Sequence, residues 1–334
     1  MKALLAAIMI AGCLLTGAAP PAQARDLIVS ASERGAYRSV QAAIDALPAD
    51  GGVVRIAPGT WREKLTISGP GVTLIGTGKR PDATILVYGD SAKSAGGTFN
   101  SATVTASGDD LRIANLTIQN DWWLVPGNPP SQAVALSLTG DRAVVTRVRL
   151  LGHQDTLFAN KGKNGRMARH YFSNCYIEGH VDFIFGNAKA YFRECRIHGL
   201  AHGDVWYTAQ SRASAEEDSG YVFDRCTLTA DPAARNVSLG RPWRDYASVV
   251  FLRTRMDAQV MPEGWREWYP GTSNRLPTTR YAEYRSFGRG ANPAARAAPA
   301  RQLTREEAAG WSLRRFFDGD IGWIDAGLKQ LRRG

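Results

Sequence analysis

Short β-rich segments recur through the middle of the chain, and they constrain its fold more than any other feature. Six of them align on one position, at steps of 32, 27, 20, 31 and 28 residues, which is occupied in order by Leu116, Val148, Cys175, Cys195, Cys226 and Thr254. Uneven steps of this size are typical of a parallel β-helix in which each coil forms one rung. Equivalent residues on neighbouring rungs then stack about 4.8 Å apart. We therefore expect an all-β fold, a right-handed parallel β-helix.

A two-sheet sandwich is the alternative for a chain with many short strands. It predicts turns every 8 to 12 residues or so and a series of hairpin signals. The one Asn-Gly pair, Asn164-Gly165, lies instead in a polar insertion. The spacing therefore favours the β-helix.

Helical signals are confined to the two ends of the chain. The apolar residues of YRSVQAAIDALP fall on one face of a short helix that Pro48 ends. Such a helix would cover the unpaired edge of the first coil. In TREEAAGWSLRRFF, Thr304 and Glu307 have the spacing of a capping box, which predicts a helix packed on the outside. With no domain linker, we expect a single domain over residues 25–334 with short capping and peripheral helices.

Residues 1–24 have the features of a secretory signal peptide. Lys2 gives a positive start, residues 3–15 are apolar, and Ala22-Gln23-Ala24 is a small-x-small cleavage site. The alternative is a lipoprotein box at residues 10–13, in which Cys13 would carry the lipid. Both interpretations predict export, secreted or lipid-anchored. No other stretch reaches the roughly 20 apolar residues of a membrane span.

The chain is strongly basic. Its net charge is +10, and removal of residues 1–24 takes away one charge, that of Lys2. A basic exported protein favours a polyanionic partner. Export argues against nucleic acid and favours an acidic polysaccharide, although a charge that serves only solubility is also consistent with the composition.

Three cysteines remain after residue 24, and all of them occupy the aligned position. The Cα atoms of a disulfide lie roughly 4.4–6.8 Å apart, so cysteines on neighbouring rungs qualify. Cys175–Cys195 and Cys195–Cys226 are both possible, whereas Cys175–Cys226 would span two rungs. Three buried free thiols are a further possibility. An odd number leaves at least one thiol unpaired or bonded to another molecule.

One phrase is written twice, as LLGHQDTLFA at residues 150–159 and as IEGHVDFIFG at residues 177–186. It places Asp155 and Asp182 in the same frame. If the rungs stack, the two carboxylates lie side by side, about one strand spacing apart. Carboxylates this close resist joint ionisation, which separates their pKa values. The pair then provides a protonated acid and an ionised base or nucleophile, as enzymes that cleave glycosides or esters require.

Neighbouring side chains complete a catalytic set. Gln154 precedes the first Asp, Gln132 lies one coil earlier, and two side-chain amides can donate to a developing oxyanion. Arg241, in LGRPW, can pair with one Asp and keep it ionised. Flat apolar faces for sugar rings are offered by Phe183, Phe185 and Trp243.

A serine triad has no support in the sequence. No G-x-S-x-G segment occurs, and none of the five His residues lies in a triad frame. His153 and His180 repeat with the two Asp residues. We expect them to shape the turn or to contact substrate rather than to act in catalysis.

Five segments resemble the signature segments of pectin methylesterases (pectinesterases), namely GHQDTLFA, YIEGHVDFIFGNAKA, LGRPW, SQAVAL and GTWRE. The resemblance covers about residues 26–330. Departures are small: Trp61 stands where Tyr is commoner, and the insertion after Ala159 resembles bacterial members. The family implies a right-handed parallel β-helix that hydrolyses galacturonate methyl esters of pectin to pectate and methanol, without a metal or other cofactor, in the modification or degradation of plant cell walls.

The same resemblance implies a role for each residue of the catalytic set. It makes Asp182 the nucleophile and Asp155 the general acid that then acts as base. It makes Gln154 the main oxyanion donor and Gln132 an accompanying donor and substrate contact. Arg241 then holds the nucleophile.

Further implications concern the substrate and the cysteines. Thr98, Phe185 and Trp243 match substrate contacts, and Cys175 and Cys195 match a disulfide of some members. The substrate is then methyl-esterified homogalacturonan, and we expect a monomer. Because the product is a polyanion, a positive cleft would hold it.

Other functions known on the same fold require different site residues, which distinguishes them from an esterase. A pectate lyase would require a calcium site of clustered acidic oxygens, and a polygalacturonase would not need two oxyanion amides. An inactive polysaccharide-binding relative should lack part of the Asp, Gln and Arg set. An esterase for other acyl groups, thioesters included, is a further alternative.

Overall fold

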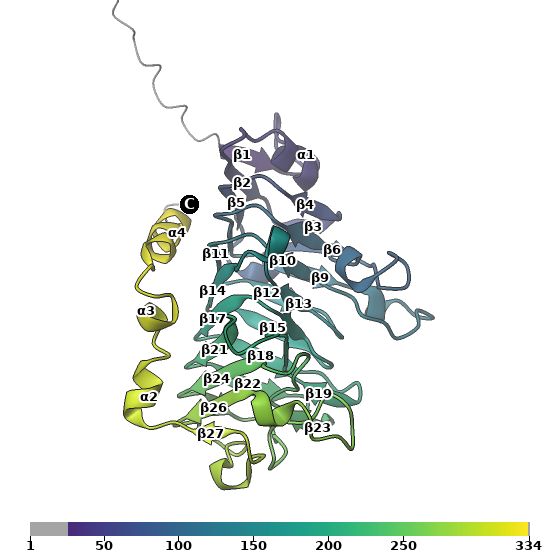
Figure 1. Ribbon diagram of the computed structural model, residues 1–334. Coiled ribbons are helices and arrows are strands. Elements are labelled where there is room, and N and C mark those ends of the chain that lie inside the picture. Colours follow the sequence, from purple (N-terminus) through teal and green to yellow (C-terminus); the bar gives the residue numbers. More distant parts are fainter. Residues whose placement is uncertain (1–25, 333–334) are drawn as a thin grey trace, which may run out of the picture.

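The computed structural model describes residues 26–332, which wind into a right-handed parallel β-helix (Figure 1). Every strand pair is parallel, and three sheets of 11, 8 and 6 strands run along the molecule. The predicted fold class is confirmed. The predicted signal peptide and the alternative lipid site at Cys13 lie outside the described residues. Within residues 26–332, no helix combines the length and the apolar character that a membrane crossing needs.

The strands are grouped here by sheet, in their spatial order. Sheet A contains β1 (Asp26–Val29), β2 (Gly52–Ile56), β5 (Val72–Gly76), β8 (Arg112–Ala114), β11 (Ala143–Thr146), β14 (Arg169–Ser173), β17 (Lys189–Arg193), β21 (Gly220–Asp224), β24 (Ser248–Leu252), β26 (Arg280–Tyr284) and β27 (Arg301–Gln302). Sheet B contains β25 (Arg255–Met256), β22 (Thr227–Ala230), β18 (Arg196–Gly199), β15 (Tyr176–Gly179), β12 (Arg149–Leu151), β9 (Thr117–Asn120), β6 (Thr84–Tyr88) and β3 (Gly59–Arg62). Sheet C contains β20 (Thr208–Gln210), β16 (Ile184–Gly186), β13 (Leu157–Ala159), β10 (Leu136–Leu138), β7 (Val104–Ala106) and β4 (Leu65–Ile67). A small fourth sheet pairs β19 (Asp204–Trp206) with β23 (Arg235–Ser238).

A single residue in the left-handed conformation turns the chain from sheet A into sheet B on successive coils. We call these positions the corner column; their φ angles lie between 50° and 56°, and they are Asn115, Arg147, Asn174, Glu194, Arg225, Arg253 and Arg285. The next residue on six of these coils is the buried position on which the six segments were aligned. The registers between neighbouring strands of sheet B keep these positions opposite one another. The predicted rung spacing is therefore confirmed.

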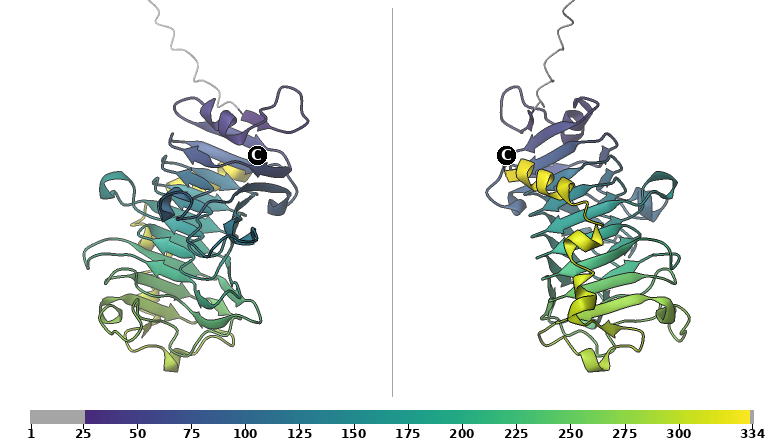
Figure 2. Two further views of the ribbon diagram at one scale, coloured as in Figure 1. Left: turned by 90° about the vertical axis from the view of Figure 1, so that its right-hand side faces the viewer. Right: turned by 60° about the vertical axis from the view of Figure 1, so that its left-hand side comes forward.

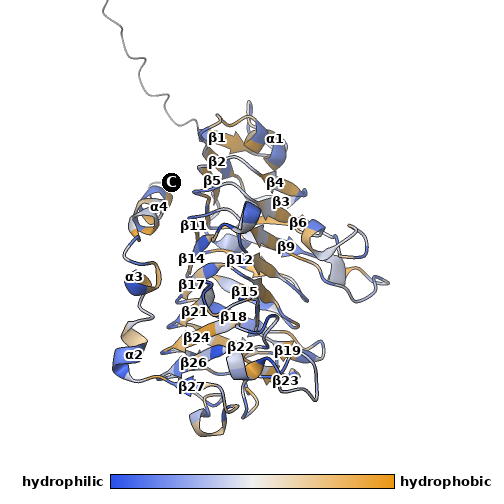
Figure 3. Cartoon of the chain, in the orientation of Figure 1, coloured by the Kyte–Doolittle hydropathy of each residue, from blue (hydrophilic) through white to orange (hydrophobic). Residues whose placement is uncertain are grey.

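The core consists of columns of like side chains inside the coils. Phe172, Phe192, Phe223 and Phe251 are opposite one another in sheet A, with successive ring centroids 4.6, 4.5 and 4.8 Å apart. All four are almost completely buried. Offset aromatic stacking adds to the hydrophobic burial of each ring. Along the strands, apolar residues alternate with more polar ones, and the projecting loops are mostly polar (Figure 3).

The N-terminal end is covered by α1 (Val40–Asp45), as the sequence predicted. The Ser39 hydroxyl caps the helix by accepting the Ala42 N–H, and three apolar side chains of the helix are buried. Because α1 lies against β1, β2 and β4, it shields the first coils from pairing with another chain (Figure 1).

The C-terminal segment runs back along the outside of sheet A as three helices, α2 (Arg305–Ala309), α3 (Leu313–Phe316) and α4 (Gly322–Arg332) (Figure 2). The predicted capping box is present: Thr304 accepts the Glu307 N–H, and the Glu307 carboxylate accepts the Thr304 N–H. Phe316, Phe317 and Trp323 pack with the outward residues of sheet A. Sequence analysis did not predict α4, whose packing partners are far away in the chain.

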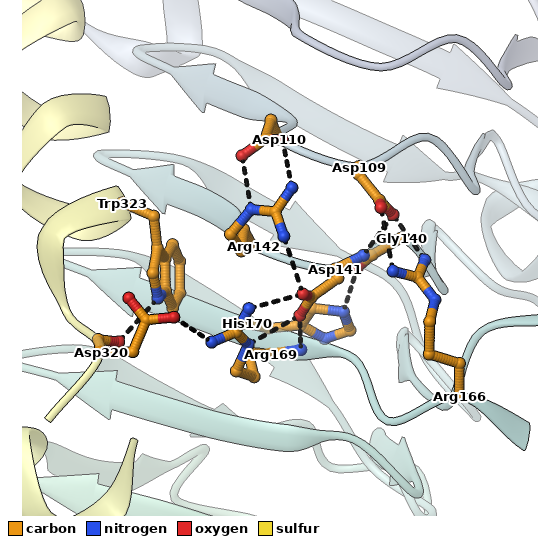
Figure 4. Close-up of polar contacts among 10 residues, drawn as sticks. All are labelled: Asp109, Asp110, Gly140, Asp141, Arg142, Arg166, Arg169, His170, Asp320 and Trp323. Carbon is orange, nitrogen blue, oxygen red and sulfur yellow. Dashed lines mark hydrogen bonds and ion pairs between the residues drawn. The ribbon is translucent and has the colours of Figure 1, made fainter. Parts of the chain in front are cut away.

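An ion-pair network ties this segment to the coils (Figure 4). Arg169 at the start of β14 donates to the buried Asp141 carboxylate at 2.7 and 2.9 Å. Its third nitrogen donates to Asp320 at 2.6 Å, and its guanidinium lies over Trp323. Asp141 also accepts from Arg142, so one carboxylate links two coils and the C-terminal segment.

The three cysteines stack in one column but are free thiols. The Cys175–Cys195 disulfide that the resemblance implies is not formed in the structure. Each sulfur instead lies near backbone carbonyls: the Cys175 thiol contacts Val145 and Ser173, and the Cys226 thiol contacts Phe192. Burial raises the pKa of the Cys175 and Cys195 thiols well above the usual value, which keeps them protonated and poorly reactive.

Candidate active site

The repeated phrase forms two corners between sheets B and C. Asp155 lies between β12 and β13, and Asp182 lies between β15 and β16. β13 and β16 pair with Leu157 opposite Ile184, so the two Asp residues precede matched positions. The Asp155 N–H donates to the Val181 carbonyl at 3.1 Å. The structure therefore places the two carboxylates on neighbouring coils.

Both Asp residues adopt the left-handed backbone conformation, with φ of 64° at Asp155 and 51° at Asp182. This conformation costs an ordinary residue about 1–2 kcal/mol, and Asp tolerates it better than most residues. The turn that follows a strand of sheet B thus presents an acidic side chain at the same corner twice. Both side chains are largely buried.

Arg241 holds Asp182 in a bidentate ion pair. The Nε donates to Oδ1 at 2.9 Å and Nη2 donates to Oδ2 at 2.7 Å. The guanidinium lies between two indole rings, 3.6 Å from the centroid of Trp206 and 4.2 Å from that of Trp268. This enclosure fixes the orientation of the fork and strengthens it by excluding water.

The two carboxyl groups differ in their electrostatic surroundings. Burial raises the pKa of Asp182, but the hydrogen bonds and charge of Arg241 oppose that rise. Burial and the nearby charge of Asp182 raise the pKa of Asp155 well above its usual value, and the more distant Arg241 opposes this only in part. Asp182 therefore ionises first and Asp155 keeps its proton.

These groups face a hollow of about 240 Å³. Its lining brings together the eight residues to which the family resemblance gave a role in catalysis or substrate binding: Thr98, Gln132, Gln154, Asp155, Asp182, Phe185, Arg241 and Trp243. It also includes three residues that the analysis did not assign, Phe99, Ala209 and Trp268. Phe99 directly follows Thr98, which was assigned as a substrate contact, so its position in the sequence was a signal that could have identified it. Trp268 lies in the irregular segment between β25 and β26, where no repeat of the coils indicates the position of a side chain.

Gln132 and Gln154 lie on neighbouring coils at one side of the hollow, where the Ala133 N–H donates to the Gln154 carbonyl at 3.1 Å. Among residues 26–332, neither side-chain amide has a hydrogen-bond partner. Both amides therefore remain available as donors to a group bound beside the two carboxyl groups.

Aromatic rings form one wall of the hollow. Phe99 and Phe158 are 4.7 Å apart, Phe158 and Phe185 are 4.8 Å apart, and Phe185 and Trp243 are 6.0 Å apart, measured between ring centroids. Phe183 does not belong to this wall. The prediction that it offers a face for sugar was wrong, because Phe183 lies in the turn between Asp182 and β16 and its buried side chain packs in the core.

His153 and His180, which precede the two Asp corners in the chain, belong to a cluster of rings outside the hollow. Their rings pack with each other and with Trp123 and His202, at centroid distances between 4.7 and 5.9 Å. Burial lowers the pKa of His153 to about 4 and that of His180 to about 3, so both are neutral near pH 7. Neither lines the hollow, which supports a role in shaping the two turns.

Positive charge is not concentrated at the hollow. Its lining holds one cation, Arg241, against two carboxyl groups. A neighbouring hollow of about 330 Å³ shares Phe99 and Trp243 and reaches Lys161 and Arg244, but Lys161 is already paired with Glu217. Within residues 26–332, no group of three or more His, Cys, Asp or Glu side chains is arranged to hold a metal ion.

Comparisons with known proteins point to one family. The family profile described as Pectinesterase matches residues 26–320. Pectinesterase 31 of Arabidopsis thaliana is 35% identical over 318 residues, which are 91% of this chain and 96% of that protein. Pectinesterase QRT1 of the same plant is 34% identical over 308 residues, 89% of this chain and 78% of that protein.

Solved structures agree. The pectin methylesterase from carrot superimposes with a TM-score of 0.81 at 29% identity, covering 90% of this chain and 95% of that one. Pectin methylesterase PemA from Erwinia chrysanthemi gives a TM-score of 0.74 at 27% identity, covering 88% and 96%. A pectin methylesterase in complex with a hexasaccharide gives 0.75 at 27% identity, covering 89% and 98%.

Proposed function

Since this chain belongs to the pectinesterase family and is a carboxylic ester hydrolase, we propose that it removes methyl groups from galacturonate methyl esters of pectin by a covalent mechanism with two aspartates. The observation that supports the mechanism most strongly is the unequal carboxyl pair. Burial raises the pKa of Asp182 but the Arg241 fork opposes that rise, whereas its neighbour Asp155 has a pKa raised well above the usual value. One group is thus a nucleophile and the other an acid at the same pH.

In the first half-reaction, an Asp182 oxygen attacks the carbonyl carbon of the methyl ester. The negative charge that develops on the carbonyl oxygen is stabilised by the amides of Gln154 and Gln132. As the tetrahedral intermediate collapses, the bond to the methoxy oxygen breaks, and Asp155 transfers its proton to that oxygen. Methanol leaves, and galacturonate remains joined to Asp182 as an anhydride.

In the second half-reaction, Asp155 is ionised and accepts a proton from a water molecule. The hydroxide attacks the galacturonate carbonyl, the anhydride bond breaks, and the Asp182 carboxylate is released. The proton remains on Asp155, so both aspartates return to their starting states. One ester and one water are consumed, and one methanol and one free carboxyl group are formed.

The substrate in this proposal is methyl-esterified homogalacturonan. The aromatic wall from Phe99 to Trp243 provides flat faces for pyranose rings and for the ester methyl group. The mature enzyme acts outside the cell as a monomer and modifies or degrades the pectin of plant cell walls. Mass spectrometry of the mature N-terminus tests export: Arg25 in first place supports a secreted protein, and a lipid on Cys13 supports an anchored one.

Methanol release from methylated pectin, measured together with the viscosity of the solution, tests the activity. We expect methanol to form without early loss of viscosity, because ester hydrolysis leaves the polymer chain intact. The Asp182→Asn variant should lose about 10⁴-fold in kcat, and Asp50→Asn, an exposed aspartate far from the site, should retain full activity. Rapid loss of viscosity, or an active Asp182→Asn variant, would contradict the proposal.

A further inference from the structure

Part of the basic charge of the chain forms a row at the corner between sheets A and B, one strand away from the catalytic corner. Four arginines lie in the corner column, Arg147, Arg225, Arg253 and Arg285, and three more lie in the first outward position of sheet B, Arg149, Arg196 and Arg255. We call these seven residues the arginine ladder. Glu194 is the one carboxylate within the two columns. Figure 1 shows the line where the strands of sheet A turn into β12, β15, β18 and β22, and the ladder residues belong to this corner by their positions in the chain.

Much of this charge is not neutralised by the protein. Arg225 lies 3.5 Å from Glu194, Arg253 is paired with Asp224, and Arg255 donates to Asp257 at 2.8 Å. The other four ladder residues, Arg147, Arg149, Arg196 and Arg285, form no ion pair with any carboxylate of residues 26–332. Repulsion among stacked cations destabilises a fold unless a partner of opposite charge offsets it.

The backbone at the corner column makes arginine an unfavourable choice. A left-handed residue with a side chain costs about 1–2 kcal/mol, and Asn or Gly fills such positions most easily. Asn115 and Asn174 occupy two of the seven corner positions, as this preference predicts. Arginine at four others places charge at a local energetic cost, and such a cost points to function.

The ladder has a regular spacing that suits a charged polymer. Arg149, Tyr176 and Arg196 occupy successive registered positions of sheet B, about 4.8 Å apart. Both guanidinium groups lie over the Tyr176 ring, at 5.5 and 6.0 Å from its centroid. The ring thus holds the two guanidinium groups apart by about two strand spacings, where each can meet a carboxylate of an extended polyuronate. Beside it, a hollow of about 580 Å³ between the corner column and α4 is lined by Arg147, Arg193 and Arg332, among other residues.

We propose that the arginine ladder is a second polysaccharide site, separate from the catalytic hollow, that binds stretches of de-esterified polyuronate. This inference rests on the proposed function, because the esterase itself would produce such stretches. The ladder residue Arg149 is the first residue of β12, and the catalytic Asp155 follows the same strand on the same coil. A chain held on the ladder therefore keeps its remaining esters close to the hollow at a raised effective concentration.

The test compares two full-chain variants with the same change in charge. The ladder variant carries Arg147→Asn, Arg149→Gln, Arg196→Gln and Arg285→Asn, in which Asn suits the left-handed positions. The control carries Arg34→Gln, Arg235→Gln, Arg305→Gln and Arg314→Gln, four exposed arginines on other surfaces. Binding to polygalacturonate is measured by calorimetry at low ionic strength, and turnover is measured on a short methyl-esterified oligogalacturonide and on half-esterified pectin.

We expect the ladder variant to bind polygalacturonate about tenfold or more weakly, since four exposed charge contacts are lost. Its kcat/KM should fall on half-esterified pectin and stay unchanged on the short oligomer. The control should bind nearly as the wild type does. Equal loss in both variants, or unchanged binding in the ladder variant, would overturn the proposal. So would binding of poly-L-glutamate as tight as that of polygalacturonate, because the site would then recognise charge alone.

Methanol release by the wild-type protein tests the proposed esterase activity independently of polygalacturonate binding. If no methanol forms from any methylated substrate, the proposed function fails, whereas weaker polygalacturonate binding by the ladder variant would still identify a polyuronate site. The two failures are therefore distinguishable.

Discussion

The ion pair between Arg241 and Asp182 permits the most direct test of the mechanism. Replacement of Arg241 by Gln removes the positive charge that favours the ionised nucleophile, while burial continues to favour the neutral form. Two unit charges about 4 Å apart at an effective dielectric constant near 20 interact by about 4 kcal/mol. At about 1.4 kcal/mol per factor of ten, the ionised fraction of Asp182 at low pH should fall roughly 10³-fold.

The direction of the effect follows from the sign of the charge. Arg241 lowers the pKa of Asp182 relative to what burial alone would produce, so its removal raises that pKa. The acid limb of kcat/KM, measured as methanol release against pH, should therefore move to higher pH. The Arg241→Lys variant keeps the charge but loses the bidentate fork, and it should shift the limb less. Circular dichroism of each variant checks that the fold is intact.

The reasoning would be refuted by an acid limb of Arg241→Gln that coincides with that of the wild type. It would also be refuted if kcat/KM fell by the same factor at every pH. In that case Arg241 would position substrate without controlling ionisation, and another group would have to keep Asp182 charged.

Three further predictions concern the oxyanion, the core and the buried histidines. Gln154→Ala should lower kcat by about 10²–10³ with little change in KM, since the amide acts on charge that develops in the transition state; a change confined to KM would indicate a substrate contact only. Phe223→Ala should lower the free energy of unfolding by about 3–5 kcal/mol in chemical denaturation, because it removes a ring from the interior of a buried aromatic stack. A loss below about 1 kcal/mol would contradict this, because the neighbouring rings would then have closed the cavity. The three buried histidines should lower the free energy of unfolding as the pH falls from about 6.5 towards 4, because burial lowers the pKa of His153 and His170 to about 4 and that of His180 to about 3, and their unfolded forms then bind more protons. The raised pKa of Asp155 acts in the opposite direction, so urea titrations across this range compare the wild type with His170→Asn, whose stability should fall less on acidification; identical pH dependence of the two would contradict the assignment.

The rung spacing was predictable because a parallel β-helix repeats one local environment. Six coils place a buried residue, mostly apolar, directly after the corner column, so aligning those residues reveals the register without knowledge of any contact. The two Asp corners follow from the same periodicity. Asp155 and Asp182 have the same sequence frame because they occupy equivalent positions on neighbouring coils.

Residues outside that periodicity could not be assigned in the same way. Trp206 and Trp268 enclose Arg241 from irregular segments, and only the path of those segments brings the indoles to the guanidinium. Phe183 and Phe185 look equivalent in the sequence, yet one lies in the core and the other in the hollow. They are two positions apart, so strand alternation alone would place them on the same face. β16 begins only at Ile184, however, and Phe183 belongs to the turn after Asp182, so the start of the strand decides its place and the sequence did not reveal that start.

The sequence by itself determined the winding of the chain and the matched corners that carry Asp155 and Asp182, because both depend on a local pattern repeated from coil to coil. The tertiary structure alone decided how Trp206 and Trp268 enclose Arg241, where the C-terminal helices dock and where the seven ladder arginines align. These features depend on contacts between segments distant in the chain. The physical reason is that a backbone repeat propagates through neighbouring hydrogen bonds, whereas ionisation and surface charge are set by the sum of all groups brought near in space.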